Sequence, residues 1–271
     1  MKSIFKVTLF FLLIFSCEDV INLDLKNSEP RLVIDASINW EKGTDGKFQT
    51  IKLSLTAPYF DTEIPPATGA IVTVTDLKNN AFSFVEEGNS GIYNNDSFIP
   101  EIGETYYLYV TYNNELYTAT ETLMPVVPIE SVEQKNDGGF SGNEIELKAF
   151  YTDPKDIENF YLFEFDIVKF ESTFFEVYED KFTDGNRIFA FYSNEDIALD
   201  DEIKITNYGI SKRAYEYYNI LLQQTDENSG DPFETQPATL RGNCINQTNP
   251  DNFPLGYFKI SETDVFTYLI E

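Results

Sequence analysis

The chain has 271 residues, of which 46 are acidic and 19 basic, giving a formal net charge of −27. Hydrophobic residues make up 42% and aromatic residues 15%; this is too apolar for a disordered acidic chain, so we expect an acidic-surfaced folded protein long enough for two domains. The charge opposes binding to nucleic acid, and the absence of histidine excludes a Ser-His-Asp triad and an HExxH zinc site.

The first segment resembles a lipoprotein signal peptide. Lys2 and Lys6 precede an apolar run over 7–15, which is too short to span a bilayer as a helix. Ile14-Phe15-Ser16-Cys17 then reads as a lipobox, although its aromatic residue departs from the small residue usual there. We predict that residues 1–16 are cleaved and that Cys17 is lipidated, so that three acyl chains hold the protein on a membrane. The alternative is an ordinary signal peptide.

Residues 17–30 are predicted to form a short lipidated tether, and a β-sandwich is predicted over 31–125. Short runs rich in β-branched and aromatic residues follow one another with no helical pattern among them. Such spacing favours about seven strands and an immunoglobulin-like or fibronectin-like sandwich. Asn113-Asn114 is expected to form a tight hairpin turn. The strand runs are 32–38, 50–55, 71–76, 82–85, 106–112 and 116–120.

The segment 99–108 resembles a corner of immunoglobulin-like and fibronectin-type domains, in which a tyrosine hydroxyl is bonded to upstream backbone. This resemblance strengthens the sandwich prediction. Pro125 and Pro128 favour an extended connector, so we place the domain boundary there and a second, β-rich domain over 129–271.

The second domain is predicted to contain strands and one helix near 212–224. Ser211 can cap the helix, and its apolar face is expected to pack against the core; that face contains Ala214, Tyr217, Tyr218, Leu221 and Leu222. The segment 225–252 is the longest irregular stretch and the best candidate for a contact surface. The strand runs are 129–133, 144–151, 161–169, 174–178, 187–192, 202–208, 255–260 and 265–270.

Two acidic segments are candidates for calcium binding. Asp153, Asp156 and Glu158 could bind calcium or act as an acid/base pair, the alternative being a solvated turn. The second segment contains Asp226, Asn228 and Asp231 and begins like a calcium loop, but proline stands at its twelfth position, where an EF-hand needs glutamate. No catalytic residue or cofactor is predicted. Cys244 is expected to be a buried apolar residue.

The whole mature sequence resembles a family of Bacteroidota outer-membrane lipoproteins known only as a domain of unknown function. The matching segments are 17–21, 32–35, 103–110, 125–129, 217–218, 242–245 and 255–258. Genes of that family often lie beside those of TonB-dependent receptors, so the resemblance implies an accessory role at such a barrel. It brings no assigned catalytic residue.

Three functions remain open. The first is a non-catalytic lipoprotein of the outer membrane that binds a β-barrel partner, most plausibly a TonB-dependent transporter. The second is a structural subunit of a protein-insertion or lipoprotein-export machine, and the third is a carboxylate-dependent glycan hydrolase. Glu18-Asp19 after Cys17 resembles an export signal to the cell surface, so we expect the protein to face outward.

Overall fold

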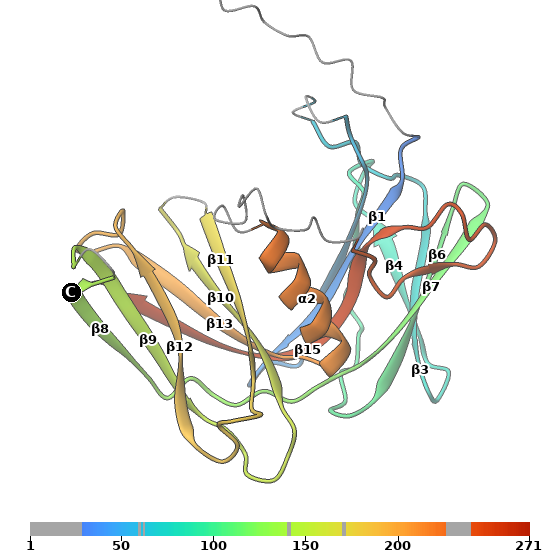
Figure 1. The fold of residues 1–271 in the computed structure, drawn as a ribbon. Helices are drawn as coiled ribbons and strands as arrows, with labels where there is room; N and C mark the ends of the chain where they lie inside the picture. The colour runs from blue at the N-terminus through green and yellow to red at the C-terminus, as the bar shows by residue number, and fades with distance from the viewer. Residues whose placement is uncertain (1–28, 59–60, 62, 140–141, 170–171, 226–239) are drawn as a thin grey trace, which may run out of the picture.

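The protein is mainly β, as predicted, with a single helix among the residues described. The computed structural model describes residues 29–58, 61, 63–139, 142–169, 172–225 and 240–271. Twelve strands form one continuous curled sheet in the order β11-β10-β13-β15-β1-β2-β5-β4-β3-β6-β7-β14, and three more form a second sheet, β12-β9-β8. Figure 1 shows two arms splayed around helix α2, with β1 and β15 running between them.

The first arm is a sandwich made by one half of the long sheet curling over itself. Inward residues alternate with outward ones along its strands, which is the pattern of a sheet with one buried face. Ile34, Ile51, Val74 and Leu108 are almost fully buried in its core. The strands are β1 (Leu32–Glu41), β2 (Gln49–Leu55), β3 (Ile71–Asp76), β4 (Ala81–Glu86), β5 (Ile92–Asn95), β6 (Thr105–Tyr112) and β7 (Glu115–Thr122).

Two predicted turns of this sandwich are confirmed. The Tyr106 hydroxyl donates a hydrogen bond to the Ile99 carbonyl oxygen at 3.0 Å and accepts one from the Glu101 amide at 2.9 Å, which is the tyrosine corner of such sandwiches. Asn113 and Asn114 have φ of 49° and 63°, as a two-residue type I′ hairpin requires.

The second arm packs the three-stranded sheet against the other half of the long sheet. Large aromatic side chains fill the space between them, and Tyr161, Phe163 and Phe165 are at most 2% exposed. The rings of Phe165 and Tyr192 stack at 5.1 Å between centroids. Its elements are β8 (Ser131–Gly138), β9 (Glu144–Thr152), β10 (Phe160–Ile167), β11 (Ser172–Glu179), β12 (Arg187–Asn194), β13 (Glu202–Gly209) and α2 (Lys212–Thr225). Two strands follow α2 in the chain, β14 (Ile245–Asn246) and β15 (Leu255–Leu269).

Strand β15 changes the predicted domain layout. Two strands were expected over 255–260 and 265–270, but one continuous strand pairs in parallel with β1 and antiparallel with β13. Cys244, Phe258 and Ile260 lie in the core of the first arm, and β14 pairs with β7. The segment 240–262 therefore packs with the N-terminal sandwich, so the proposed division into 31–125 and 129–271 does not describe how the cores are assembled.

Helix α2 begins as predicted and covers the outer face of the second arm's sheet. The Ser211 Oγ accepts a hydrogen bond from the Ala214 amide at 3.1 Å, which caps the helix. Ala214 is 1% exposed in a small cluster with Phe160, Leu162 and Tyr257. The rings of Tyr217 and Tyr218 lie 4.6 and 6.0 Å from that of Tyr257, while Leu221 and Leu222 are half-buried.

Candidate functional site

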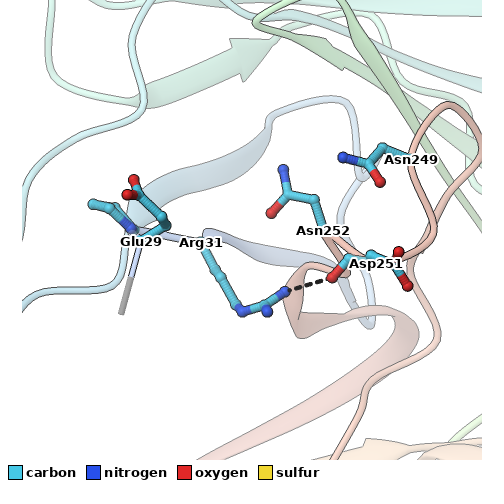
Figure 2. Close-up of a pocket in the computed structure, with 6 residues that line it drawn as sticks. Glu29, Arg31, Asn249, Asp251 and Asn252 are labelled. Atoms are coloured by element: carbon cyan, nitrogen blue, oxygen red, sulfur yellow. Dashed lines mark hydrogen bonds between the residues drawn. The ribbon is translucent and has the colours of Figure 1, made fainter. Parts of the chain in front are cut away.

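A cavity opens where the described chain begins, at one end of the N-terminal sandwich. Its volume is about 550 Å³ and its lining includes Glu29, Arg31, Asn249, Asp251 and Asn252 (Figure 2). Strand β1 begins here, and the loop between β14 and β15 folds back beside it. The sequence had singled out the region 225–252 as a contact surface, and the described end of that region does line this cavity.

A second cavity of about 270 Å³ adjoins the first and shares Pro30 and Asn252 with it. Its lining includes Glu115, which accepts hydrogen bonds from Tyr117 at 2.6 Å, Asn252 at 2.7 Å and Asn246 at 2.9 Å. The bond from Tyr117 is the main reason that the pKa of Glu115 is lowered. Glu115 therefore stays ionised and fixes the β6–β7 hairpin to the β14–β15 loop.

Two arginines stack on one phenylalanine beside the first cavity. The guanidinium carbons of Arg31 and Arg241 lie 3.9 and 3.8 Å from the centroid of the Phe253 ring. They must occupy opposite faces, because two guanidinium groups cannot fill the same space. Arg31 also donates to the carbonyl oxygens of Asp251 at 3.1 Å and Phe253 at 3.2 Å. Two of the few cations in an acidic chain thus lie next to the cavity, with donors available to a polar partner.

Two segments singled out by the family resemblance, 242–245 and 255–258, meet in the structure. The Asn243 side chain donates to the Phe258 carbonyl oxygen at 2.7 Å and accepts from the Phe258 amide at 2.8 Å. A Cβ on Gly242 would lie 1.6 Å from the Gly256 carbonyl oxygen, so only glycine fits that crossing. These residues hold the 240–246 segment on β15 and are structural.

A buried lysine lies on β15 between the arms. Lys259 is 4% exposed; its Nζ donates to Asn39 Oδ1 at 2.8 Å and lies 3.8 Å from the centroid of the Tyr208 ring. Burial lowers its pKa to about 7, against the opposing charges of Glu164 and Asp35. A lysine of this kind can act as a nucleophile when substrate reaches it, but Lys259 lines neither cavity described above.

The first predicted acidic segment, 153–158, contributes only one residue to an acidic cluster in the structure. Asp153 is 1% exposed and is no part of a solvated turn. Its carboxylate lies near those of Asp180 and Asp184, whereas Asp156 and Glu158 do not belong to this group. Glu158 instead forms an exposed ion pair with Lys212 at 3.2 Å. Asp180 and Asp184 were missed because sequence proximity was the only guide.

Of the other predicted site residues, four lie outside the residues that the structure describes, and Cys244 is a buried core residue. Cys17, Asp226, Asn228 and Asp231 lie outside the residues that the structure describes. Cys244 is buried, as expected, and burial raises the pKa of its thiol to about 12, so it is a poor nucleophile. In the described part of the chain, no helix has the length and apolar character needed to span a bilayer.

Comparison with known proteins gives a family and remote structural likenesses. A two-domain fibronectin type III segment of chicken tenascin matches with 10% identity and a TM-score of 0.22, covering 69% of this chain and 89% of that one. The chicken interferon gamma receptor alpha chain matches with 11% identity and a TM-score of 0.21, covering 67% and 89%. Both TM-scores are too low to support an argument about function. Comparison with curated proteins gives no match.

The family match covers residues 18–266 of the 271-residue chain. The chain belongs to the family described as a domain of unknown function, DUF4249.

Proposed function

We propose that this protein is a lipid-anchored, non-catalytic lipoprotein of the outer membrane that acts as an accessory binding subunit of a β-barrel, namely a TonB-dependent transporter. The observation that carries the proposal is the lipobox ending at Cys17. The family match begins directly after it, at residue 18. An acyl anchor at Cys17 confines the protein to a membrane surface, where its partners would be other membrane components.

Chain geometry supports a contact surface at the anchored end of the sandwich. The 12 Cα-to-Cα steps from Cys17 to Glu29 can span at most about 40 Å when fully extended. The cavity lined by Glu29 and Arg31 must then lie within that distance of the lipid anchor. A barrel in the same membrane is a partner that this end would reach.

The charge of the chain favours a protein partner over the lipid surface itself. A net charge of −27 repels anionic head groups, so the body is not expected to adsorb on them. The anchored end instead presents amide, carboxylate and guanidinium groups from Asn249, Asn252, Asp251 and Arg31. Such groups suit hydrogen bonding with loops of another protein.

The test is purification of the native complex from membranes. A tag placed after Glu271, with a Cys17→Ser variant as control, should recover a transporter barrel with the wild-type chain. The variant should leave the membrane fraction, lose metabolic labelling with a fatty acid and lose the barrel. Recovery of insertion or export machinery would support the structural-subunit alternative, and fatty-acid labelling of the variant equal to that of wild type would refute the anchor.

A second variant tests the contact surface separately from the anchor. Asp251→Lys reverses a charge at the anchored end, and Asp137→Lys, on the exposed end of β8, is its matched control. We expect Asp251→Lys to reduce the amount of barrel recovered while labelling at Cys17 is unchanged. Equal recovery with both variants would place the contact elsewhere. Protease treatment of intact cells tests the outward orientation, since protection would indicate the periplasmic face.

A further inference from the structure

We propose that Asp153, Asp180 and Asp184 form a calcium site at the end of the second arm. Asp153 follows strand β9 directly, Asp180 follows β11, and Asp184 lies in the turn that leads to β12. One carboxylate oxygen from each lies within 4.8 Å of the others. The site is distinct from the cavities at the anchored end and from the proposed barrel contact.

The three carboxylates are held in place by backbone amides. The Asn159 amide donates to Asp180 Oδ2 at 2.8 Å, and the Asp156 amide donates to Asp184 Oδ1 at 2.7 Å. Asp153 accepts one bond on each oxygen, from the Tyr161 hydroxyl at 2.7 Å and from the Gly185 amide at 3.3 Å. In Asp180 and Asp184 the second carboxylate oxygen is left for another partner, and each oxygen of Asp153 keeps a further lone pair. The site is therefore ordered by the chain before any ion enters.

Burial of these carboxylates without a cation is unfavourable. Asp153 and Asp180 are 1% and 6% exposed, and none of the three carboxylates forms an ion pair with a lysine or arginine among the described residues. Three carboxylates with oxygens within 4.8 Å of one another also repel each other when all are ionised. A divalent cation would replace the lost hydration and neutralise this repulsion.

A buried hydroxyl without a partner points independently to an occupant. Tyr151 is 0% exposed, and its hydroxyl makes no hydrogen bond. Tyr151 lies two residues before Asp153 and so on the same face of the chain leaving β9. Its ring packs at 5.1 Å against that of Tyr161, whose hydroxyl donates to Asp153, so the Tyr151 side chain lies beside the cluster. The Oγ1 of Thr183, within the turn itself, is also buried without a partner. A hydrated ion would supply water molecules to both hydroxyls.

The ligand chemistry favours calcium. All the donors are oxygen atoms, which hard divalent cations prefer. Calcium–oxygen distances of about 2.3–2.6 Å allow two ligands to be up to about 5 Å apart, whereas the shorter bonds of magnesium allow only about 4 Å. Oxygens up to 4.8 Å from one another are close to the span of a calcium site, and small side-chain rotations would bring all three to one ion. The ion would fasten the ends of three strands together.

Calcium titration of the detergent-purified full chain tests the proposal. After treatment with a chelator, wild type should bind one calcium ion with a measurable heat, and its melting temperature should rise. Asp180→Asn should weaken that binding by at least about tenfold. Asp184→Asn, which alters an exposed residue, should do the same with little risk to folding.

Asp156→Asn is the matched control. It removes one nearby charge outside the cluster, and its positive φ of 63° suits asparagine, so its calcium affinity should match wild type within about twofold. Tyrosine-sensitised terbium luminescence should appear in wild type and in the control, because Tyr161 donates to Asp153 at 2.7 Å, and should be lost in Asp184→Asn. Many weak calcium sites, equal in all variants, would overturn the proposal.

Discussion

Replacement of Lys259 by methionine tests the energetic consequence of burying an amine between the arms. The side chain is 4% exposed, and among the residues described its amine makes one hydrogen bond, to Asn39 Oδ1 at 2.8 Å. Burial lowers its pKa to about 7. The wild-type protein is therefore destabilised at neutral pH relative to a chain with an apolar side chain of similar size at this position.

The direction and size of the pH effect on stability follow from the pKa of Lys259 in the unfolded and folded states. An unfolded lysine titrates near 10.4, and the folded one near 7, so between these values the unfolded state binds one more proton. The stability of wild type should then rise with pH in this window, by up to about 1.4 kcal/mol per pH unit. Methionine has no proton to bind. The stability difference between Lys259→Met and wild type should therefore fall by about 3 kcal/mol from about pH 7 to 9.5.

The assay is urea unfolding of both proteins at several pH values in this range. Using the difference removes the contribution of every other titrating group. The variant also loses the hydrogen bond to Asn39, which offsets about 1–3 kcal/mol of the stability that it gains at pH 7 by removing the buried amine. The test is therefore how the stability difference changes with pH, because this offset does not depend on the titration of Lys259. Lys52→Met, at an exposed position of β2, should show a flat difference. A flat difference for Lys259→Met as well would refute the reasoning.

Three further changes address the close contacts of the fold. Asn243→Asp loses a buried donor and places a carboxylate against a backbone carbonyl oxygen, so we expect a loss of about 3 kcal/mol or more in urea unfolding. Gly242→Ala should lower the free energy of unfolding by at least about 3 kcal/mol, because the added Cβ would lie 1.6 Å from the Gly256 carbonyl oxygen. Gly88→Ala, whose Cβ meets nothing within 4 Å, should cost only about 1 kcal/mol for its positive φ; equal losses would contradict the close approach. Tyr106→Phe removes both bonds of the corner and should cost about 1–3 kcal/mol, while Tyr107→Phe should lie within about 0.5 kcal/mol of wild type.

The strands of the first sandwich could be predicted because each has one buried and one exposed face. Alternation along β1 to β4 and β6 to β7 gives a signal of period two in the sequence itself. Strand β5 (Ile92–Asn95) was not predicted, since it is short and half asparagine. Its place depends on Tyr93, which is 0% exposed and donates its hydroxyl proton to the Ala67 carbonyl oxygen at 2.9 Å. Such a distant contact leaves no local pattern.

The acidic site shows the same limit. Sequence spacing groups Asp153 with Asp156, but a chain that leaves β9 in a turn directs these two carboxylates to different surroundings. The partners of Asp153 come from the end of β11 and the following turn. Only the pairing of β10 with β11 and of β12 with β9 places that turn beside it. Neither strand pairing can be predicted from the local sequence, so the partners of Asp153 could not be predicted either.

The polar run over 261–264 explains why β15 was expected to break and why it does not. Glu262 accepts a hydrogen bond from the Val126 amide at 2.9 Å, and Asp264 accepts one from the Ile129 amide at 2.8 Å. These carboxylates accept hydrogen bonds from backbone amides of the proline-flanked connector. Polar residues are therefore needed where β15 passes between the two cores, because the amides would otherwise be buried without a partner. The extended connector that was predicted to separate two domains is thereby fixed to the strand that joins the arms.

This arrangement has a consequence for the proposed anchoring. The tether leads into β1, and β1 is paired with β15 from Val33–Leu255 to Glu41–Thr263. The same β15 continues into the sheet of the second arm through its pairing with β13. Because the connector is bonded to β15 at two points, the second arm has no free hinge at 125–129. An anchor at Cys17 would therefore carry both arms as one unit, and a partner bound at the anchored end would have the second arm, with its acidic cluster, at a fixed distance from the bound surface.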